Sequence, residues 1–238
     1  MTIQSASVAP KRFFFDSGTQ AEVRFTVQSA TPADVTVYFD RGGEEARQIR
    51  LAAVPFGVEQ VVSWNGIGND RRPAVDGAYS VLVGETGGPA KTVGKVTLHG
   101  HFFPVRGVHG TRGPIGDFGA PRSGGRTHQG FDVVAGCGTP LVAARGGTVV
   151  RKRFDPALDG NFVVIAGRKE GLTYRYSHLI EPSPLDVGDR VHTGDAVGNV
   201  GKTGNAVSVG CHLHFEMRRS NKRFIDPEPF LRAWDRFS

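Results

Sequence analysis

The 238-residue chain has few of the residues that build several common kinds of site. It contains only two cysteines and no CxxC pair, which excludes a zinc site made of four thiolates. It has no HExxH motif, so the glutamate base of that motif is not implied. No stretch approaches the roughly 20 apolar residues of a membrane-spanning helix. The sequence therefore predicts a chain without a transmembrane segment.

The chain also lacks the signatures of two other classes of protein. Residues 1–17 do not have the basic, then apolar, then small-residue layout of a signal peptide, so either export does not use that route or a leader was removed. Lys and Arg total 29 against 23 Asp and Glu, and the net charge of +6 favours anionic partners. Without an arginine-rich run, a helix-turn-helix pattern or an aromatic–basic RNA signature, nucleic acid is not an expected partner. A solvated surface with a modest charge excess also accounts for this charge.

Residues 20–98 show the pattern of short strands separated by turns. Apolar side chains alternate with polar ones in AEVRFTV and DVTVYF, at Val23, Phe25 and Val27 and then at Val35, Val37 and Phe39. Further strands are expected in QVVSW, AYSVLV and GKVTL, with Gly-, Asn-, Asp- and Pro-rich turns at GGEE and GNDRRPAVDGAY. This alternation, with frequent turn signals, predicts a β-sandwich.

Residues 63–83, SWNGIGNDRRPAVDGAYSVLV, resemble the closing hairpin of bacterial Ig-like domains of the flagellar-hook-cap type. Those domains carry a Trp-Asn/Asp-Gly turn and a later Asp-Gly-x-Tyr. The resemblance implies an Ig-like β-sandwich over residues 1–98. In such a domain Trp64 and Tyr79 belong to the core.

The composition changes after this region. Residues 99–127, rich in Gly, Pro and Arg, are interpreted as a linker that merges into a long loop. From residue 128 to 238 strands are again expected in GGTVVRKRF, NFVVIAG, LTYRYSHL, AVGNVG and HLHFEMR, with Gly-Asp turns between short strands. The tail IDPEPFLRAW predicts a short helix that Asp226 caps and Pro227 begins. The predicted fold class is therefore all-β, with two domains.

Histidines and a carboxylate occur at spacings that suit a metal. Side chains alternate along a strand, so His212 and His214 face the same way. His128 and Asp132 lie four apart and converge if the chain curves between them, and with one histidine of the HLH pair they make three protein ligands. Three protein ligands plus a water is the arrangement of a catalytic zinc. His178, at the end of a strand, is a further candidate.

Five motifs in order resemble the M23 (lysostaphin/LytM-like) zinc peptidases over residues from about 103 to 230. They are HQGFDVVAGCGTPLVAARGGTVV, GNFVVIAG, YRYSHL, VGDRVHTGDAVGNVGKTGN and HLHFE. The resemblance implies a barrel-like antiparallel peptidase domain over residues 128–238. It also implies one Zn²⁺ per chain on His128, Asp132 and His214, with His178 and His212 as the catalytic pair. None of these five positions is substituted, which argues for activity.

The resemblance also implies a substrate and a mechanism. The expected activity is that of a zinc metalloendopeptidase, which hydrolyses stem or cross-bridge peptide bonds of bacterial peptidoglycan. His178 and His212 are expected to share two tasks, to orient or deprotonate the water and to donate to the oxyanion or the leaving amine. Glu216, on the same face as His212 and His214, is interpreted either as a partner that orients an imidazole or as a surface residue.

In this arrangement Cys137 and Cys211 lie near the zinc, and a disulfide between them is expected. It would close a loop of 74 residues, worth about 4 kcal/mol in the chain-entropy model, and would imply an extracytoplasmic location. Two reduced buried thiols are the alternative. Thiolate ligation of zinc is less favoured because three ligands are already assigned.

Two other functions remain open from the sequence. One is a non-catalytic or latent LytM-like protein that binds or activates at the cell wall. The other is a lipoyl-like carrier, suggested by the Gly-Asp hairpins, although Lys202 lacks the setting of a carrier lysine. Three roles are open to residues 1–98: positioning the enzyme on the wall, masking the site, or binding a protein partner.

Overall fold

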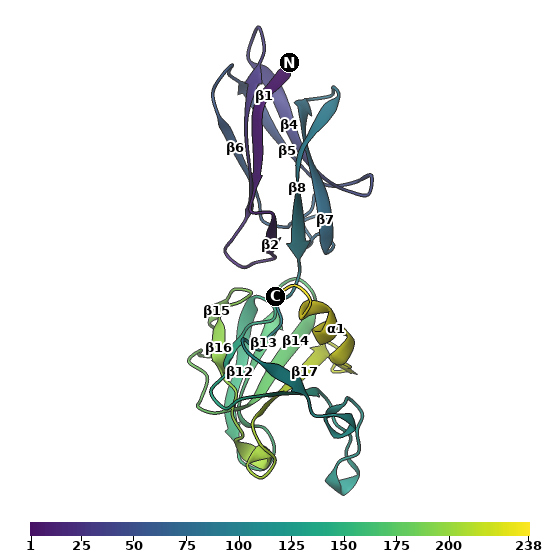
Figure 1. The fold of residues 1–238 in the computed structure, drawn as a ribbon, viewed down its shortest axis with the longest axis vertical. Coiled ribbons are helices and arrows are strands. Elements are labelled where there is room, and N and C mark those ends of the chain that lie inside the picture. The colour runs from purple at the N-terminus through teal and green to yellow at the C-terminus, as the bar shows by residue number, and fades with distance from the viewer. The chain divides into compact units, whose positions relative to one another are not determined.

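The computed structural model describes all residues from 1 to 238 and divides them into two compact units, Met1–Gly100 and His101–Ser238. β-Strands are the main secondary structure of both units (Figure 1). The second unit begins at His101. Residues 101–127, which the sequence analysis assigned to a linker and loop, are therefore part of it. No helix has the length and apolar character that crossing a membrane would require.

The first unit consists of two sheets. The smaller sheet has the strand order β1-β3-β6 and the larger has the order β2-β8-β7-β4-β5. Neighbouring strands are antiparallel, except that β2 runs parallel to β8. The strands are β1 (Thr2–Ala9), β2 (Arg12–Phe14), β3 (Ala21–Gln28), β4 (Ala33–Arg41), β5 (Glu44–Val54), β6 (Gln60–Trp64), β7 (Gly77–Glu85) and β8 (Ala90–His99).

One hydrophobic core joins these two sheets. The alternating side chains of β3 and β4 that the sequence predicts to share a face are all buried in this core. Trp64 and Tyr79 are each 1% exposed, which confirms that they belong to the core. The strands β1, β2 and β5 were not predicted, because β5 is rich in charged residues and β1 and β2 fall within residues 1–17, which were considered only as a possible leader. The Ig-like assignment stays a prediction.

The second unit is organised around a sheet with the strand order β15-β12-β13-β14-β17-β10-β9, to which β18 adds beside β17. A separate pair, β11 and β16, packs nearby. The strands are β9 (His109–Thr111), β10 (Phe131–Ala135), β11 (Pro140–Val142), β12 (Gly147–Asp155), β13 (Gly160–Gly167), β14 (Leu172–Leu179), β15 (Arg190–Val191), β16 (Ala196–Asn199), β17 (His212–Arg219) and β18 (Phe224–Ile225).

The single α-helix, α1 (Glu228–Trp234), closes the chain and buries Leu231 and Trp234 against the core of this unit. Its start differs slightly from the expectation. Pro227 is the residue that caps the helix, and the Asp226 carboxylate accepts the backbone N–H of Glu228 at 3.0 Å. The helix therefore begins one residue later than predicted.

Two loop segments project from the same end of the second unit (Figure 1). One, teal in Figure 1, carries the 3-10 helices η1 (Pro114–Gly116) and η2 (Ser123–Gly125) between β9 and β10. The other, green, carries η3 (Gly204–Ala206) between β16 and β17. Residues of both segments line one cleft, and the floor of this cleft is formed by the ends of β10, β14 and β17.

Candidate metal centre and catalytic site

Two adjacent strands bring Asp132 and His214 together. Asp132 on β10 is paired directly with His214 on β17 in the antiparallel register. Residues paired in this way project from the same face of a sheet, with Cβ atoms about 4.5–5.5 Å apart. His128 joins them from the loop that leads into β10. All three residues are buried.

The three candidate ligand atoms form a small triangle. His128 Nε2 lies 2.8 Å from His214 Nδ1, and each of these nitrogens lies 3.0 Å from Asp132 Oδ1. Ligands at about 2.0–2.2 Å from a tetrahedral zinc ion are roughly 3.3–3.6 Å from one another. The triangle therefore needs to open only by roughly half an ångström along each edge to fit such an ion.

The other ring nitrogens determine the tautomer of each histidine. His128 Nδ1 donates to the carbonyl oxygen of Asp117 at 2.9 Å, and His214 Nε2 donates to Glu216 Oε1 at 3.1 Å. When the imidazole is neutral, each donation leaves the opposite nitrogen, His128 Nε2 or His214 Nδ1, with a lone pair that faces the triangle. Two lone pairs and a carboxylate oxygen this close repel one another unless a positive charge lies among them.

The ionisation of these groups reflects the same need for a positive charge. Burial raises the pKa of Asp132, but hydrogen bonds with His128 and His214 outweigh it and hold the pKa well below its ordinary value. Burial lowers the pKa of His214, but hydrogen bonds with Asp132 and Glu216 outweigh it and raise the pKa to about 9. A metal ion would replace the proton on His214, because ligating imidazoles are neutral. The residues fit a zinc ion held by two imidazoles and one carboxylate.

Gly130 allows the loop to approach β17 closely. A Cβ at this position would lie 2.5 Å from the carbonyl oxygen of Phe215 and 2.8 Å from Cε1 of His214. Such contacts are closer than real Cβ atoms make, so a larger residue would push His128 away from His214. Packing therefore explains the glycine between His128 and Asp132.

Asp159, His214 and Glu216 form a second group of possible ligands, but one guanidinium already contacts both of its carboxylates. Arg175 Nη1 donates to Asp159 Oδ2 at 2.7 Å, and Arg175 Nε lies 3.3 Å from Glu216 Oε2. Glu216 is buried, so it is not a surface residue. Its bond to His214 favours the interpretation that it orients this imidazole.

The backbone of His178 departs from the strand pattern. Ser177 pairs with His214 across β14 and β17, so a regular strand would turn His178 to the opposite face, with Tyr176 in the core. Instead, φ of His178 is 63°, in the left-handed region that costs a non-glycine residue of order 1–3 kcal/mol. The ring centre of His178 consequently lies 4.8 Å from that of His212 and 5.9 Å from that of His214.

His178 and His212 form a pair of neutral imidazoles. Each donates its Nδ1–H to a backbone carbonyl at 2.9 Å, that of Thr203 and that of Gly210 respectively, which leaves Nε2 able to accept a proton. Burial, followed by the neighbouring imidazoles, lowers the pKa of His178 to about 3, and burial also lowers the pKa of His212. His212 Nε2 lies 3.8 Å from Asp132 Oδ1, beside the ligand triangle.

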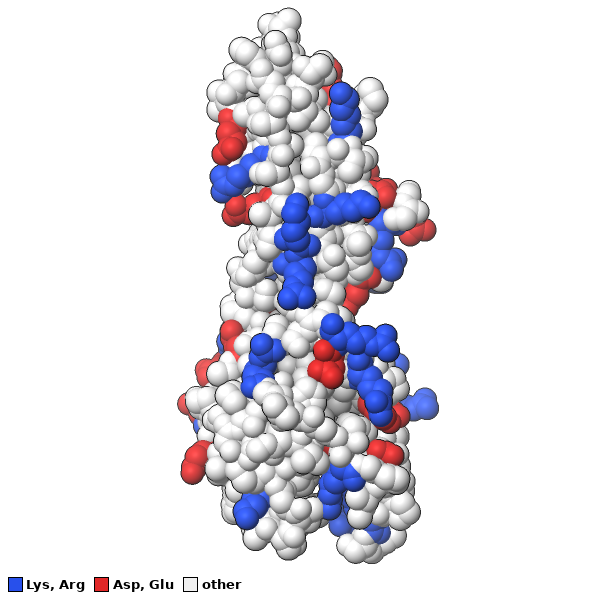
Figure 2. Space-filling model, viewed as in Figure 1, with Lys and Arg blue, Asp and Glu red and all other residues white.

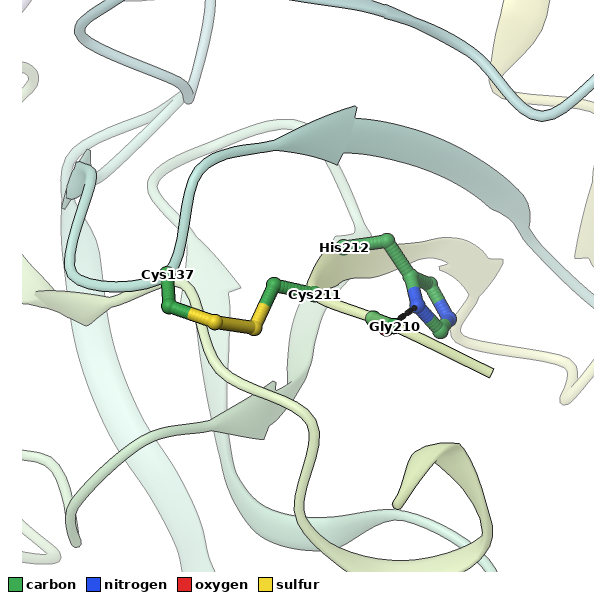
Figure 3. Close-up of a disulfide and its surroundings, with 4 residues drawn as sticks. All are labelled: Cys137, Gly210, Cys211 and His212. Carbon is green, nitrogen blue, oxygen red and sulfur yellow. Dashed lines mark hydrogen bonds between the residues drawn. A yellow bond between two sulfur atoms is a disulfide. The ribbon is translucent and has the colours of Figure 1, made fainter. Parts of the chain in front are cut away.

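A disulfide joins Cys137 and Cys211, as expected from the sequence, so these cysteines are not free thiols. Figure 3 shows Cys211 next to His212, with its side chain directed away from the imidazole, and the bond reaching Cys137 in the turn after β10. The disulfide therefore ties the turn after β10, the strand that carries Asp132, to the start of β17, where the Nδ1–H of His212 donates to the carbonyl oxygen of Gly210.

All five predicted site residues line one cleft, namely His128, Asp132, His178, His212 and His214. The other four histidines of the chain, for which the sequence suggests no role, do not line it: His99, His101, His109 and His192. Sequence reasoning missed two arginines: Arg112 Nη1 and Arg122 Nη2 lie 3.2 Å and 3.6 Å from Asp132 Oδ2. In the sequence, only the high arginine content of the segment before His128 pointed to such contacts. This segment has no regular alternation of apolar and polar residues, so the direction of its side chains could not be predicted.

Part of the chain is similar to known peptidases. Residues 126–227 match the model of peptidase family M23. The L-Ala–D-Glu endopeptidase of Bacillus subtilis is 33% identical over 162 residues, which cover 62% of this chain and 48% of that protein. The peptidoglycan DD-endopeptidase ShyC of Vibrio cholerae is 36% identical over 91 residues, covering 38% of this chain and 20% of that protein.

The chain is also similar to a solved structure, the catalytic domain of the antimicrobial peptidase lysostaphin from Staphylococcus simulans. The identity is 27%, the TM-score is 0.45, and the match covers 52% of this chain and 92% of that one. This chain spans less than half the length of either curated relative.

Proposed function

Because residues 126–227 are a domain of peptidase family M23, we propose that the chain is a zinc-dependent endopeptidase that hydrolyses peptide bonds of bacterial peptidoglycan. One observation carries this proposal. Two histidine lone pairs and a carboxylate oxygen converge within 3.0 Å of one another, directly beside a pair of neutral histidines in an open cleft. This combination is the donor set of a catalytic zinc together with groups that can transfer protons.

The metal ligands in this proposal are His128 through Nε2, His214 through Nδ1 and Asp132 through Oδ1. When bound, Zn²⁺ supplies Lewis acidity, which polarises a peptide carbonyl and makes water acidic enough to react near neutral pH. The carbonyl oxygen of Asp117 and the carboxylate of Glu216 hold the two imidazoles in their ligating tautomers.

Proton transfer falls to His178 and His212. Both are neutral, and both present Nε2 with Nδ1 held by a backbone carbonyl. The Nε2 of one imidazole accepts a proton of the attacking water. That same proton, on this imidazole or passed to its neighbour, then stabilises the developing oxyanion and goes to the leaving amine, which restores two neutral imidazoles. The left-handed backbone of His178 supports such a role, since strain of this kind is stored where a side chain has a special task.

Peptidoglycan is the proposed substrate because the names of the relatives describe an L-Ala–D-Glu endopeptidase and a peptidoglycan DD-endopeptidase. These two names denote different bonds, so they support the substrate class and not one scissile bond. The disulfide supports an oxidising, extracytoplasmic location, where such a substrate is found.

A second candidate function is a latent or non-catalytic protein that binds at the cell wall. It is favoured by the position of the segment that carries η1 and η2, whose Arg112 and Arg122 reach Asp132 and so cover one side of the ligand set. In that case zinc binds but the cleft does not admit a peptide.

The test combines zinc stoichiometry with hydrolysis of purified peptidoglycan, with and without a chelator. One zinc per chain and release of wall peptides that stops with chelator and returns with added Zn²⁺ is the expected result. His192→Ala, an exposed histidine of the same unit that lies outside the cleft, is the matched control and keeps full activity. One zinc per chain without release from walls of several types would favour the latent protein, and no zinc would overturn both functions.

A further inference from the structure

The cleft beside the ligand triangle has a volume of about 430 Å³, and one of its walls is basic. Three arginines on the segment between β9 and β10 line this wall: Arg112, Arg122 and Arg126. On the face of the molecule drawn in Figure 2, basic side chains also gather in places, with acidic side chains close to them. In the cleft, the three arginines of the wall all come from one segment.

The carboxylates that line the cleft do not neutralise this wall. Asp159 and Glu216 are both engaged by Arg175 on the cleft floor. Asp132 is therefore the one lining carboxylate left for the wall, and its Oδ1 already belongs to the ligand triangle. Its single remaining oxygen, Oδ2, is shared by Arg112 and Arg122.

Arg126 has no carboxylate partner at all. Its Nε donates to the carbonyl oxygen of Ser123 at 3.2 Å, which leaves the planar end of the guanidinium unengaged. Arg126 also lies opposite Arg122 in a tight turn, because the backbone N–H of Arg122 donates to the carbonyl of Arg126 at 2.9 Å. Like charges held opposite each other repel, and an anion bound by both relieves that repulsion.

We propose that Arg126, together with Arg112 and Arg122, binds a carboxylate of the substrate next to the scissile bond. This inference rests on the proposed function and narrows its substrate class. The enzyme then acts on wall peptides that carry a free carboxylate near the cleaved bond, and acts poorly on amidated peptides or on uncharged glycine bridges. A guanidinium suits this task because its planar N–H donors match a carboxylate in a bidentate manner.

The test uses cross-linked stem-peptide dimers with free carboxylates, the same dimers after amidation, and a glycine-bridged dimer. The native protein should cleave the free-carboxylate dimer with a kcat/KM roughly 10- to 100-fold above that of the amidated one, the size of a charge-assisted hydrogen bond. Arg126→Gln should lower kcat/KM for the free-carboxylate dimer and leave the amidated dimer unchanged, while Arg126→Lys should keep part of the preference. Arg126 is exposed, so these variants are expected to fold.

Arg236→Gln, an exposed arginine of the same unit outside the cleft, removes the same charge and should keep the full preference. Equal cleavage of free and amidated dimers by the native protein would overturn the inference. A loss of kcat/KM of equal size on both substrates in Arg126→Gln would also overturn it, because that pattern indicates a structural role.

A binding measurement separates this inference from the proposed function. His212→Ala, which retains the three metal ligands, is titrated with the two dimers by calorimetry, alone and combined with Arg126→Gln. Tighter binding of the free-carboxylate dimer, lost with Arg126→Gln, supports the inference even if the native protein cleaves neither dimer. Equal binding of both dimers overturns it even if the native protein cleaves both.

Discussion

The two units of this chain differ in what they bury. Of the twelve buried polar or charged residues, Thr36 alone lies in the first unit, where its hydroxyl pairs with that of Thr86 at 2.8 Å. The other eleven lie in the second unit and include four histidines, Asp132 and Glu216. The first unit is thus organised by hydrophobic packing, and the second unit also buries a network of ionisable groups.

Such a network is costly unless every member has a partner, because removing a charge or an imidazole from water forfeits its solvation. In the second unit the partners are present: backbone carbonyls hold three of the imidazoles, and Glu216 holds His214. The ligand triangle alone also needs a positive charge, which a proton on His214 or a bound metal ion supplies. Both units are β-structures, so the feature that distinguishes the unit with the candidate site is its buried polar groups.

The largest expected effect comes from removing single histidines of the network. His214→Ala should abolish stoichiometric zinc binding and turnover, because it removes one of only three ligands. His212→Ala should keep the zinc and lower kcat by roughly 10²- to 10⁴-fold, the usual contribution of a general acid or base. Atomic absorption and peptidoglycan hydrolysis measure the two quantities, with His192→Ala as the control. Equal loss of zinc in both variants would contradict the division of roles.

The second prediction concerns the first unit and its hydrophobic core. Trp64 packs on Phe39 and Tyr79, with ring centres 4.5 Å and 4.8 Å away, and its Nε1–H donates to the carbonyl of Ile67. Trp64→Ala should destabilise this unit by about 3–5 kcal/mol, as measured by denaturant unfolding. Zinc stoichiometry should not change, since the first unit contributes no ligand. A loss of zinc in the folded variant would contradict the assignment of all metal ligands to the second unit.

The third prediction removes the disulfide of the second unit. Replacing Cys137 and Cys211 together by serine frees a loop of 74 residues and should destabilise this unit by at most about 4 kcal/mol in the chain-entropy model. Turnover should fall more than zinc affinity, because the bond lies next to His212 and not next to a ligand. Unfolding curves with and without reductant provide the measurement, and the first unit, which has no cysteine, is the internal control. Unchanged stability of the second unit would contradict this account.

The same comparison explains what the sequence could predict. Period-two alternation depends only on local geometry, so the strands that carry Val23, Val35 and their neighbours were predictable, as was the common face of His212 and His214. The charge-rich strand β5 was missed because its pattern resembles that of a loop. Cross-strand pairing of Asp132 with His214 requires the register, which the spacing of the motifs does not contain.

Three features of the site lay outside any local pattern. His178 shares the parity of the core tyrosines, and only its left-handed backbone turns it toward His212. The carbonyl of Asp117 and the guanidinium of Arg112 reach the ligand set from a segment without periodicity. Such positions are set by loop conformation, and loop conformation depends on contacts between residues that are distant in sequence.

The smallest expected effect comes from replacing a buried glutamate, with the replacement of an exposed glutamate as the comparison. Glu216 accepts from His214 Nε2 at 3.1 Å and lies 3.3 Å from Arg175, whereas Glu22 of the first unit pairs with Arg24 at 2.9 Å with nearly half of each side chain exposed. Glu216→Gln should weaken zinc binding by roughly 10- to 100-fold, because an amide holds the ligating tautomer of His214 less firmly than a carboxylate.

Glu22→Gln is the matched control, and it should change neither zinc affinity nor stability by more than about 1 kcal/mol, since surface ion pairs contribute little. Competition with a chelator of known affinity measures the metal, and thermal unfolding measures stability. Equal zinc affinity in Glu216→Gln and in the native protein would mean that the carboxylate only pairs with Arg175 and stabilises the fold. The imidazole of His214 would then be oriented by Asp132 and by the backbone of β17, and the buried charge of Glu216 would be structural in the same sense as the Trp64 packing of the first unit.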